Sequence, residues 1–187
     1  MKKTRYIIGL FLCVVLIQIA VPISKIVRWE MTLQNGQQFR FRTAPVDPYD
    51  AFRGRYVALQ IEQNIAPVTE GVKLIRNQMV YAQIEESEQG FAKFVKVTLH
   101  RPQGSAYLKA KVQYLTGDKV VLCLPFDRYY MEEKIAPAAE TAYRKHSRKD
   151  VQDAYVTVRV KSGFAVLEKL YVGEKTIEEY IKDQRDI

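Results

Sequence analysis

An apolar run from Tyr6 to Ile23 constrains the fold of this chain more than any other feature. Gln18 is the only strongly polar residue within it. As an α-helix, a run of this length rises about 27 Å, close to the thickness of the hydrocarbon core of a bilayer. We therefore expect an uncleaved transmembrane anchor at residues 6–23, preceded by a short basic cytoplasmic tail at residues 1–5.

Two other interpretations of this run fit the residues less well. A cleaved signal peptide needs small residues before its cleavage site, and no Ala-x-Ala pattern precedes a credible cleavage site after this run. A buried core helix would show a polar face. Lys25 and Arg28 follow the run, so basic charge flanks both of its ends. The very short basic N-terminal tail favours an N-inside orientation, and Trp29 suits the outer interface.

The chain beyond the anchor alternates apolar and polar residues with a period of two. Residues 24–37 form a juxtamembrane segment that ends in the turn signal Asn35-Gly36. From residue 38 onward, short alternating runs are separated by turns, which is typical of antiparallel strands. The apolar positions include Phe39 and Phe41, then Val57, Leu59 and Ile61, Val80, Ala82 and Ile84, Val95, Val97 and Leu99, and Val156, Val158 and Val160.

We therefore predict a mainly β (α+β) fold: one N-terminal transmembrane helix, then an antiparallel β-rich extracytoplasmic domain at residues 38–187 with seven to nine strands. Asp127 resembles a helix N-cap, and Pro137 would interrupt a helix. These signals predict helices near 128–148, in two pieces at 128–135 and 137–148. We predict a long loop or a short helix at residues 63–78. Thr176 and Glu179 form a capping box for a terminal helix.

Charge and cysteine content exclude several classes of function. The net charge of +8 is partly due to the N-terminal tail, so the rest of the chain is only mildly basic. That balance suits a neighbour of anionic lipid headgroups, whereas its scattered lysines do not suggest a nucleic-acid partner. Cys13 and Cys123 predict no disulfide, and His100 and His146 stand apart from other metal ligands. We expect no metal and no cofactor.

The stretch from Pro45 to Ile61 contains the densest cluster of local structural signals in the sequence. Asp47 followed by Pro48 is a strong helix start, Asp50 can complete a capping box, and Gly54 is a helix stop. A half-buried strand should then run from Tyr56 to Ile61.

Two interpretations of the charged residues in this stretch are open. In the structural one, Asp47 and Asp50 cap backbone N–H groups and pair with Arg53 or Arg55. In the catalytic one, the two carboxylates perform acid–base chemistry, which needs paired groups in different environments. Two interpretations are also open for Glu132 and Glu133. Their negative charges could stabilise the N-terminus of the predicted helix, or one of their carboxylates could face a cleft and act in function.

This stretch resembles the GDYXXLXY family of bacterial membrane-anchored proteins. The likeness rests on Pro-Val-Asp-Pro-x-Asp at 45–50 and Arg-Gly-x-Tyr-Val-x-Leu at 53–59. It extends to Gln18, the strand pair around Gly90, Arg101-Pro102, the run Tyr129-Tyr130-Met131-Glu132-Glu133, and the hairpin at Gly163. Arg55 and Ile61 depart from the aspartate and the final tyrosine of the name-giving motif. The candidate site residues are Pro45, Asp47, Asp50, Arg53, Gly54, Tyr56, Leu59, Tyr130, Glu132 and Glu133.

The resemblance implies an extracytoplasmic domain, often encoded beside a polytopic membrane protein, and no particular reaction. We therefore expect a binding or accessory module in the bacterial cytoplasmic (inner) membrane, with a periplasmic domain and an integral membrane partner. The alternative is a membrane-anchored hydrolase that uses the carboxylates of the Pro45–Gly54 stretch. A signal-peptidase-like enzyme, pairing Ser24 with Lys93 or Lys96, is a weaker form of that alternative.

Overall fold

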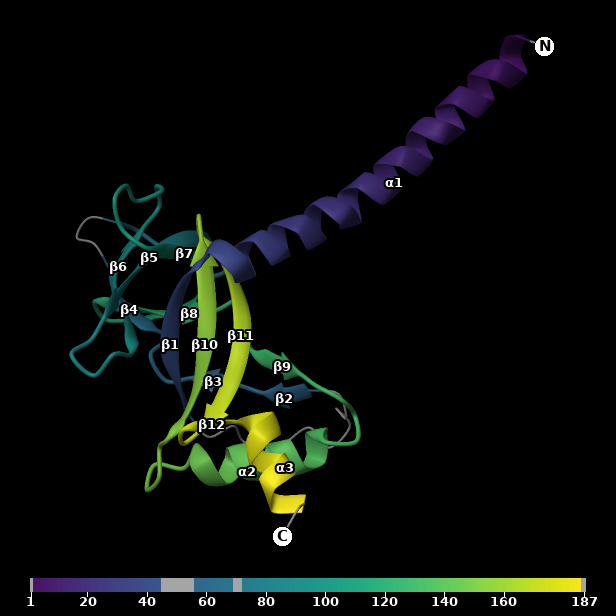
Figure 1. Ribbon diagram of the computed structural model, residues 1–187. Coiled ribbons are helices and arrows are strands. Elements are labelled where there is room, and N and C mark those ends of the chain that lie inside the picture. The colour runs from purple at the N-terminus through teal and green to yellow at the C-terminus, as the bar shows by residue number, and fades with distance from the viewer. Residues whose placement is uncertain (1, 45–55, 69–71, 186–187) are drawn as a thin grey trace.

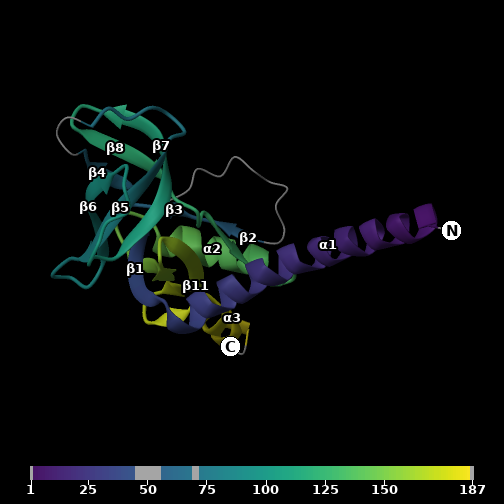
Figure 2. The ribbon, with the colours of Figure 1, turned by 90° about the horizontal axis from the view of Figure 1, so that it is seen from above.

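The computed structural model describes residues 2–44, 56–68 and 72–185, and it begins with one long helix. Helix α1 (Lys2–Asn35) projects away from a β-rich domain, with the N-terminus at its far end (Figure 1). Figures 1 and 2 both show α1 leaving the domain on the side away from strand β6 (Ala92–Thr98). The predicted anchor is thus one part of a longer helix, and residues 24–35 of the predicted juxtamembrane segment continue it.

Helix α1 is long and apolar enough to cross a membrane. The candidate span covers Tyr6–Asn35, and none of its most apolar window is buried against the rest of the protein. Pro22 lies inside the helix, where it removes one backbone donor; transmembrane helices tolerate this. Transfer of these exposed apolar side chains from water to a lipid or protein interior would be favourable.

The first sheet contains five strands in the order β12-β11-β10-β1-β3. Its antiparallel centre is formed by β1 (Gln37–Ala44), β10 (Ala154–Lys161) and β11 (Phe164–Val172). The short strands β3 (Gln60–Ile61) and β12 (Lys175–Thr176) lie at its edges. Phe39, Phe41, Val156, Val158 and Val160 are all buried, which confirms the predicted period-two faces.

The second sheet also has five strands, in the order β4-β8-β7-β5-β6. They are β4 (Ile65–Pro67), β8 (Lys119–Cys123), β7 (Tyr107–Thr116), β5 (Met79–Glu86) and β6. The predicted hairpin of β5 and β6 is confirmed. The predicted loop or short helix at 63–78 instead contains β4, because residues 65–67 pair with the apolar strand β8.

The two sheets share one core at Phe41. The exposed fraction of Phe41 is 0%, and its ring lies 5.8 Å from that of Phe94 on β6. On its other side, the ring centroid of Phe126 is 5.3 Å away. Aromatic rings at these separations bury a large apolar area and add specific geometry, so a residue of the first sheet fixes where the second sheet packs.

The predicted helix at 128–135 is wrong. Residues Arg128–Tyr130 form strand β9, which pairs with β2 (Tyr56–Ala58) in a separate two-stranded ribbon. The carbonyl oxygen of Asp127 accepts a 2.8 Å hydrogen bond from the N–H of Leu59, so the residue predicted as an N-cap joins a strand pair. A partner distant in sequence therefore overrides the local cap signal.

Two helices close the other end of the domain. Helix α2 (Ala136–His146) begins without a side-chain cap and carries a proline in its first turn, as Pro137 predicted. Helix α3 (Ile177–Arg185) has the predicted capping box: Thr176 Oγ1 lies 2.8 Å from the carboxylate of Glu179, which also accepts the Thr176 N–H. Within α3, the side chains of Ile177 and Ile181 are buried.

The end of α1 is packed tightly onto the first sheet. The Gly36 N–H donates to the Thr32 carbonyl oxygen at 2.8 Å and ends the helix. A Cβ at residue 36 would overlap that oxygen and lie 3.1 Å from Cβ of Arg159. About two turns before Gly36, the guanidinium of Arg28 lies 4.7 Å from the centroid of the Phe164 ring. Helix and hairpin therefore meet over several residues.

We predict that Gly36→Ala lowers the free energy of unfolding by about 1–3 kcal/mol, because the added methyl overpacks this junction. Circular dichroism of the full chain in detergent micelles, followed during urea denaturation, measures the loss. Gly9→Ala is the control, since a Cβ there has no neighbour within 4 Å. Equal stability of the two variants would show that the helix end is not packed as described.

Candidate functional site

Most of the candidate residues from the central stretch fall in a part of the chain that the structure does not describe. Those outside the described residues are Pro45, Asp47, Asp50, Arg53 and Gly54. The predicted cap at Asp47, the predicted helix stop at Gly54 and the predicted ion pairs therefore stay predictions. The structure does fix the flanking residues, Ala44 and Tyr56.

Both flanks of this stretch are attached to the domain. The hydroxyl of Tyr143 on α2 donates to the carbonyl oxygen of Ala44 at 3.0 Å, and Ala44 also pairs with Gln60 on β3. Tyr56 pairs with Tyr130 across the β2–β9 ribbon. The stretch thus leaves the first sheet and returns at the ribbon, at defined positions.

Tyr56 and Tyr130 form an aromatic pair beside a cation. Their ring centroids are 5.5 Å apart, and the Arg128 guanidinium lies 5.1 Å from the centre of the Tyr56 ring. A hydrogen bond with Tyr130 raises the pKa of Arg128. Tyr130 is 66% exposed, so this cluster faces solvent, whereas Leu59 is buried in the core. These candidate residues therefore combine a buried packing residue, Leu59, with the half-buried Tyr56 and the exposed Tyr130.

Glu132 and Glu133 lie in the turn between β9 and α2, and both are exposed. The carbonyl oxygen of Glu132 accepts hydrogen bonds from the N–H groups of Ile135 and Ala136, each at 3.1 Å. Among the described residues, no group of three or more His, Cys, Asp or Glu side chains could hold a metal ion. These two glutamates thus lie on the surface of a turn.

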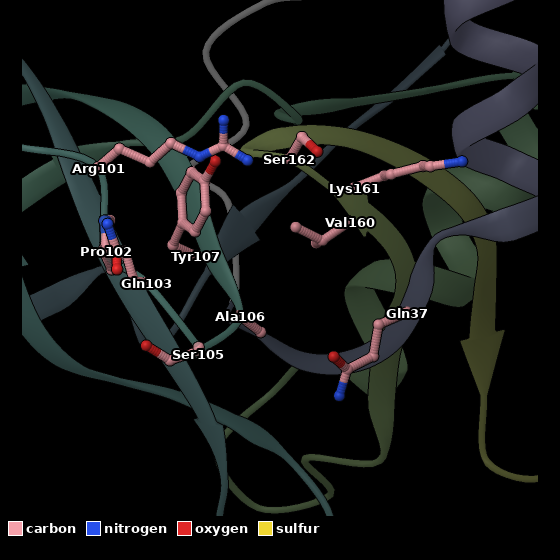
Figure 3. Close-up of a pocket in the computed structure, with 11 residues that line it drawn as sticks. Gln37, Arg101, Pro102, Gln103, Ser105, Ala106, Tyr107, Val160, Lys161 and Ser162 are labelled. Carbon is pink, nitrogen blue, oxygen red and sulfur yellow. The ribbon is translucent and has the colours of Figure 1, made fainter.

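A polar cleft of about 760 Å³ opens at the end of the domain that α1 joins (Figure 3). Residues 101–107 form one wall, and Gln37 with the end of β10 and its turn forms the other. Ala106, Tyr107 and Val160 supply apolar surface. The polar side chains are those of Gln37, Arg101, Gln103, Ser105, Lys161 and Ser162.

Gly163 lies where the two walls of the cleft contact each other. Its φ is +78°, in the left-handed region that favours glycine. A Cβ there would lie 2.6 Å from Cε2 of Tyr107. Its carbonyl oxygen accepts a 2.9 Å hydrogen bond from the N–H of Lys109 on β7. The β10–β11 turn of the first sheet is therefore docked directly onto the second sheet.

The cleft is cationic. None of the eleven described residues that line it is acidic, and two of them are Arg101 and Lys161. In the part of the chain that the structure describes, neither cation has a carboxylate partner within 4.0 Å. The Arg101 guanidinium instead lies 5.6 Å from the centre of the Tyr107 ring.

The sequence does not indicate this cleft. Arg101-Pro102 and the Gly163 hairpin stand out in it only as parts of the family resemblance. No pattern around Lys161 distinguishes that residue. The signal that unites them is three-dimensional, because about sixty residues separate the two walls along the chain.

A hydrogen-bonded network reinforces the wall next to α1. Arg159 contacts a carboxylate oxygen of Glu168 at 3.1 Å and donates to the Gly36 carbonyl oxygen at 3.2 Å. Gln38 donates to the other Glu168 oxygen at 2.6 Å. Partial burial by itself would raise the pKa of Glu168, but these hydrogen bonds and the charge of Arg159 outweigh it and lower that pKa below 4.5.

The fold and the cleft define a class: a β-rich domain carried on one apolar helix that is long enough to span a membrane. The model of the family described as GDYXXLXY protein matches residues 18–170, which is most of the chain. The chain belongs to this family. No curated protein matches the chain, and no solved structure matches it either.

We predict that Glu168→Gln lowers the free energy of unfolding by about 1–2 kcal/mol at neutral pH, since it weakens a partly buried, charge-assisted network. Because folding lowers the pKa of Glu168, its contribution is present above the unfolded value of about 4.5 and is lost as the pH falls through the lower folded value. Urea titrations at several pH values test this.

The difference between wild type and Glu168→Gln should therefore shrink as the pH drops below about 4.5. Glu140→Gln is the matched control, because its partner Arg144 and Glu140 itself are both more than half exposed, and it should change stability by at most about 0.5 kcal/mol. A difference that stayed constant down to acidic pH would exclude the charged network as its source.

Proposed function

We propose that this protein is a membrane-anchored accessory or binding module of the bacterial cytoplasmic membrane. Its β-rich domain lies on the periplasmic side and works with an integral membrane partner. The observation that carries the proposal is α1: its candidate span is apolar, uncovered by the domain and packed onto the first sheet at its C-terminal end. A helix fixed in this way holds the domain against the membrane surface.

The orientation rests on charge. Lys2, Lys3 and Arg5 lie in the few residues before the apolar run, and short loops rich in Lys and Arg remain on the cytoplasmic side. Of the basic residues after the run, Arg28 stacks on Phe164 of the domain. The N-terminal charges therefore favour a cytoplasmic tail and an exported domain.

The integral membrane partner is supported by the surface of α1 beyond residue 23. Arg28 and Thr32, four residues apart, contact the domain, and Thr32 is buried. In contrast, Ile26 is 65% exposed and Trp29 47% exposed. An exposed apolar helix surface at the membrane boundary suits contact with a helix of another membrane protein.

No described feature favours the hydrolase alternatives. Glu132 and Glu133 lie on an exposed turn, and Asp47 and Asp50 lie outside the described residues. For a signal-peptidase-like enzyme, Ser24 would need a lysine base. Its hydroxyl donates to the Val21 carbonyl oxygen of its own helix at 2.7 Å, so it is engaged within α1.

Site-specific photo-crosslinking in cells tests the proposed partnership. With a photoreactive residue in place of Trp29, we expect a covalent adduct with a protein of several transmembrane helices, which mass spectrometry identifies. The same residue at Thr32 is the control and should give no such adduct, because Thr32 is covered by the domain. Adducts at position 29 with lipid alone would contradict a helix-mediated partnership.

A further inference from the structure

We propose that the cleft between residues 101–107 and the β10–β11 turn binds the phosphate of an anionic phospholipid headgroup. The lipid belongs to the leaflet that borders the domain. This inference rests on the part of the proposed function in which α1 spans the membrane, and it is independent of any protein partner.

The height of the cleft above the membrane comes from the contact between Arg28 and Phe164. The Arg28 guanidinium lies 4.7 Å from the centre of the Phe164 ring. Phe164 is the first residue of β11 and directly follows the turn residues Ser162 and Gly163 in the chain. Arg28 is five residues beyond Ile23, the last residue of the predicted anchor, which is about 7.5 Å along a helix. Each headgroup layer is about 5–7.5 Å thick. With the anchor ending at Ile23, the β10–β11 turn therefore lies at the outer edge of the headgroup layer.

The position of the turn is visible in the ribbon view. Figure 1 shows the tip of the β10–β11 hairpin beside the last turns of α1, whereas α2 and α3 lie at the other end of the domain. The cleft includes this tip through Lys161 and Ser162. A tilt of α1 toward the cleft would bring it still closer to the lipid.

The side chains in the cleft match the chemistry of a phosphate diester. Arg101 offers a planar fork of N–H donors that suits phosphate oxygens, and Lys161 adds a second positive charge. Figure 3 shows the Arg101 guanidinium near the Tyr107 ring, on the side where Ser162 lies, and Lys161 extending toward α1. Ser162 supplies a hydroxyl donor between the two cations.

The solvent exposure of the polar side chains in the cleft favours a lipid phosphate over a free phosphate ion as the ligand. Arg101, Ser105 and Ser162 are all exposed, so their hydrogen bonds to a dissolved anion would compete with water. A headgroup is different, because the anchor holds the cleft at a surface where phosphates are concentrated. Lys25 and Arg28 of α1 lie at the same level and strengthen the attraction to anionic lipid.

Native mass spectrometry of the full chain tests the proposal. The chain is presented in mixed micelles with equal amounts of phosphatidylglycerol and phosphatidylcholine, and the retained lipids are counted. Wild type should retain phosphatidylglycerol preferentially. Arg101→Gln and Lys161→Gln should each reduce that preference about fivefold, as expected for the loss of one cation near an anionic surface.

Two variants control this experiment. Lys149→Gln removes an exposed cation in the segment between α2 and β10 and should leave the lipid preference unchanged. Arg101→Lys keeps the charge and should retain more of the preference than Arg101→Gln. Thermal melts that match wild type establish that each variant is folded.

An unchanged preference in both Arg101→Gln and Lys161→Gln would overturn the proposal. Removal of phosphatidylglycerol by excess inorganic phosphate would overturn it too, since the site would then recognise any free phosphate. Flotation with phosphatidylcholine vesicles separates this failure from failure of the anchor. A chain that floats without a preference contradicts the lipid site alone, and a chain that does not float contradicts the anchor.

Discussion

The contact between α1 and the β10–β11 hairpin determines how the rest of the molecule is placed. Thr32 is buried, Gly36 lets the helix end against Arg159, and Arg28 stacks on Phe164. These contacts extend over more than two turns of helix, so the domain is held in a fixed position relative to α1. Without them, the apolar helix and the β domain would be joined only by a flexible link, and no surface of the domain would have a fixed relation to the helix.

The same hairpin also joins the two sheets. Phe164 meets the helix, and the residue before it, Gly163, packs on Tyr107 and bonds to Lys109 of the second sheet. The cleft is the space left beside this three-way contact. Its two cations, Arg101 and Lys161, therefore lie on segments that flank this junction.

The features that the sequence predicts well are local or repetitive. Phe39 and Phe41 alternate with arginines, and a strand with one buried face must follow that pattern. Thr176 and Glu179 cap a helix three residues apart, without help from the rest of the chain. The cap signal at Asp127 failed because β2 supplies hydrogen-bond partners from a distant part of the chain. The cleft could not be predicted for the same reason, since Arg101 and Lys161 come to line one cleft only after the two sheets pack.

A spin label measures the height of the β10–β11 turn relative to the bilayer directly. In the labelled protein, both native cysteines, Cys13 and Cys123, are replaced, a nitroxide is attached at Ser162→Cys, and the full chain is reconstituted in vesicles. Relaxation by lipid-soluble oxygen and by a water-soluble nickel complex gives the depth of the label. We expect headgroup depth at residue 162 and full water exposure for the same label at Lys149. Equal, fully aqueous values at both positions would contradict this expectation.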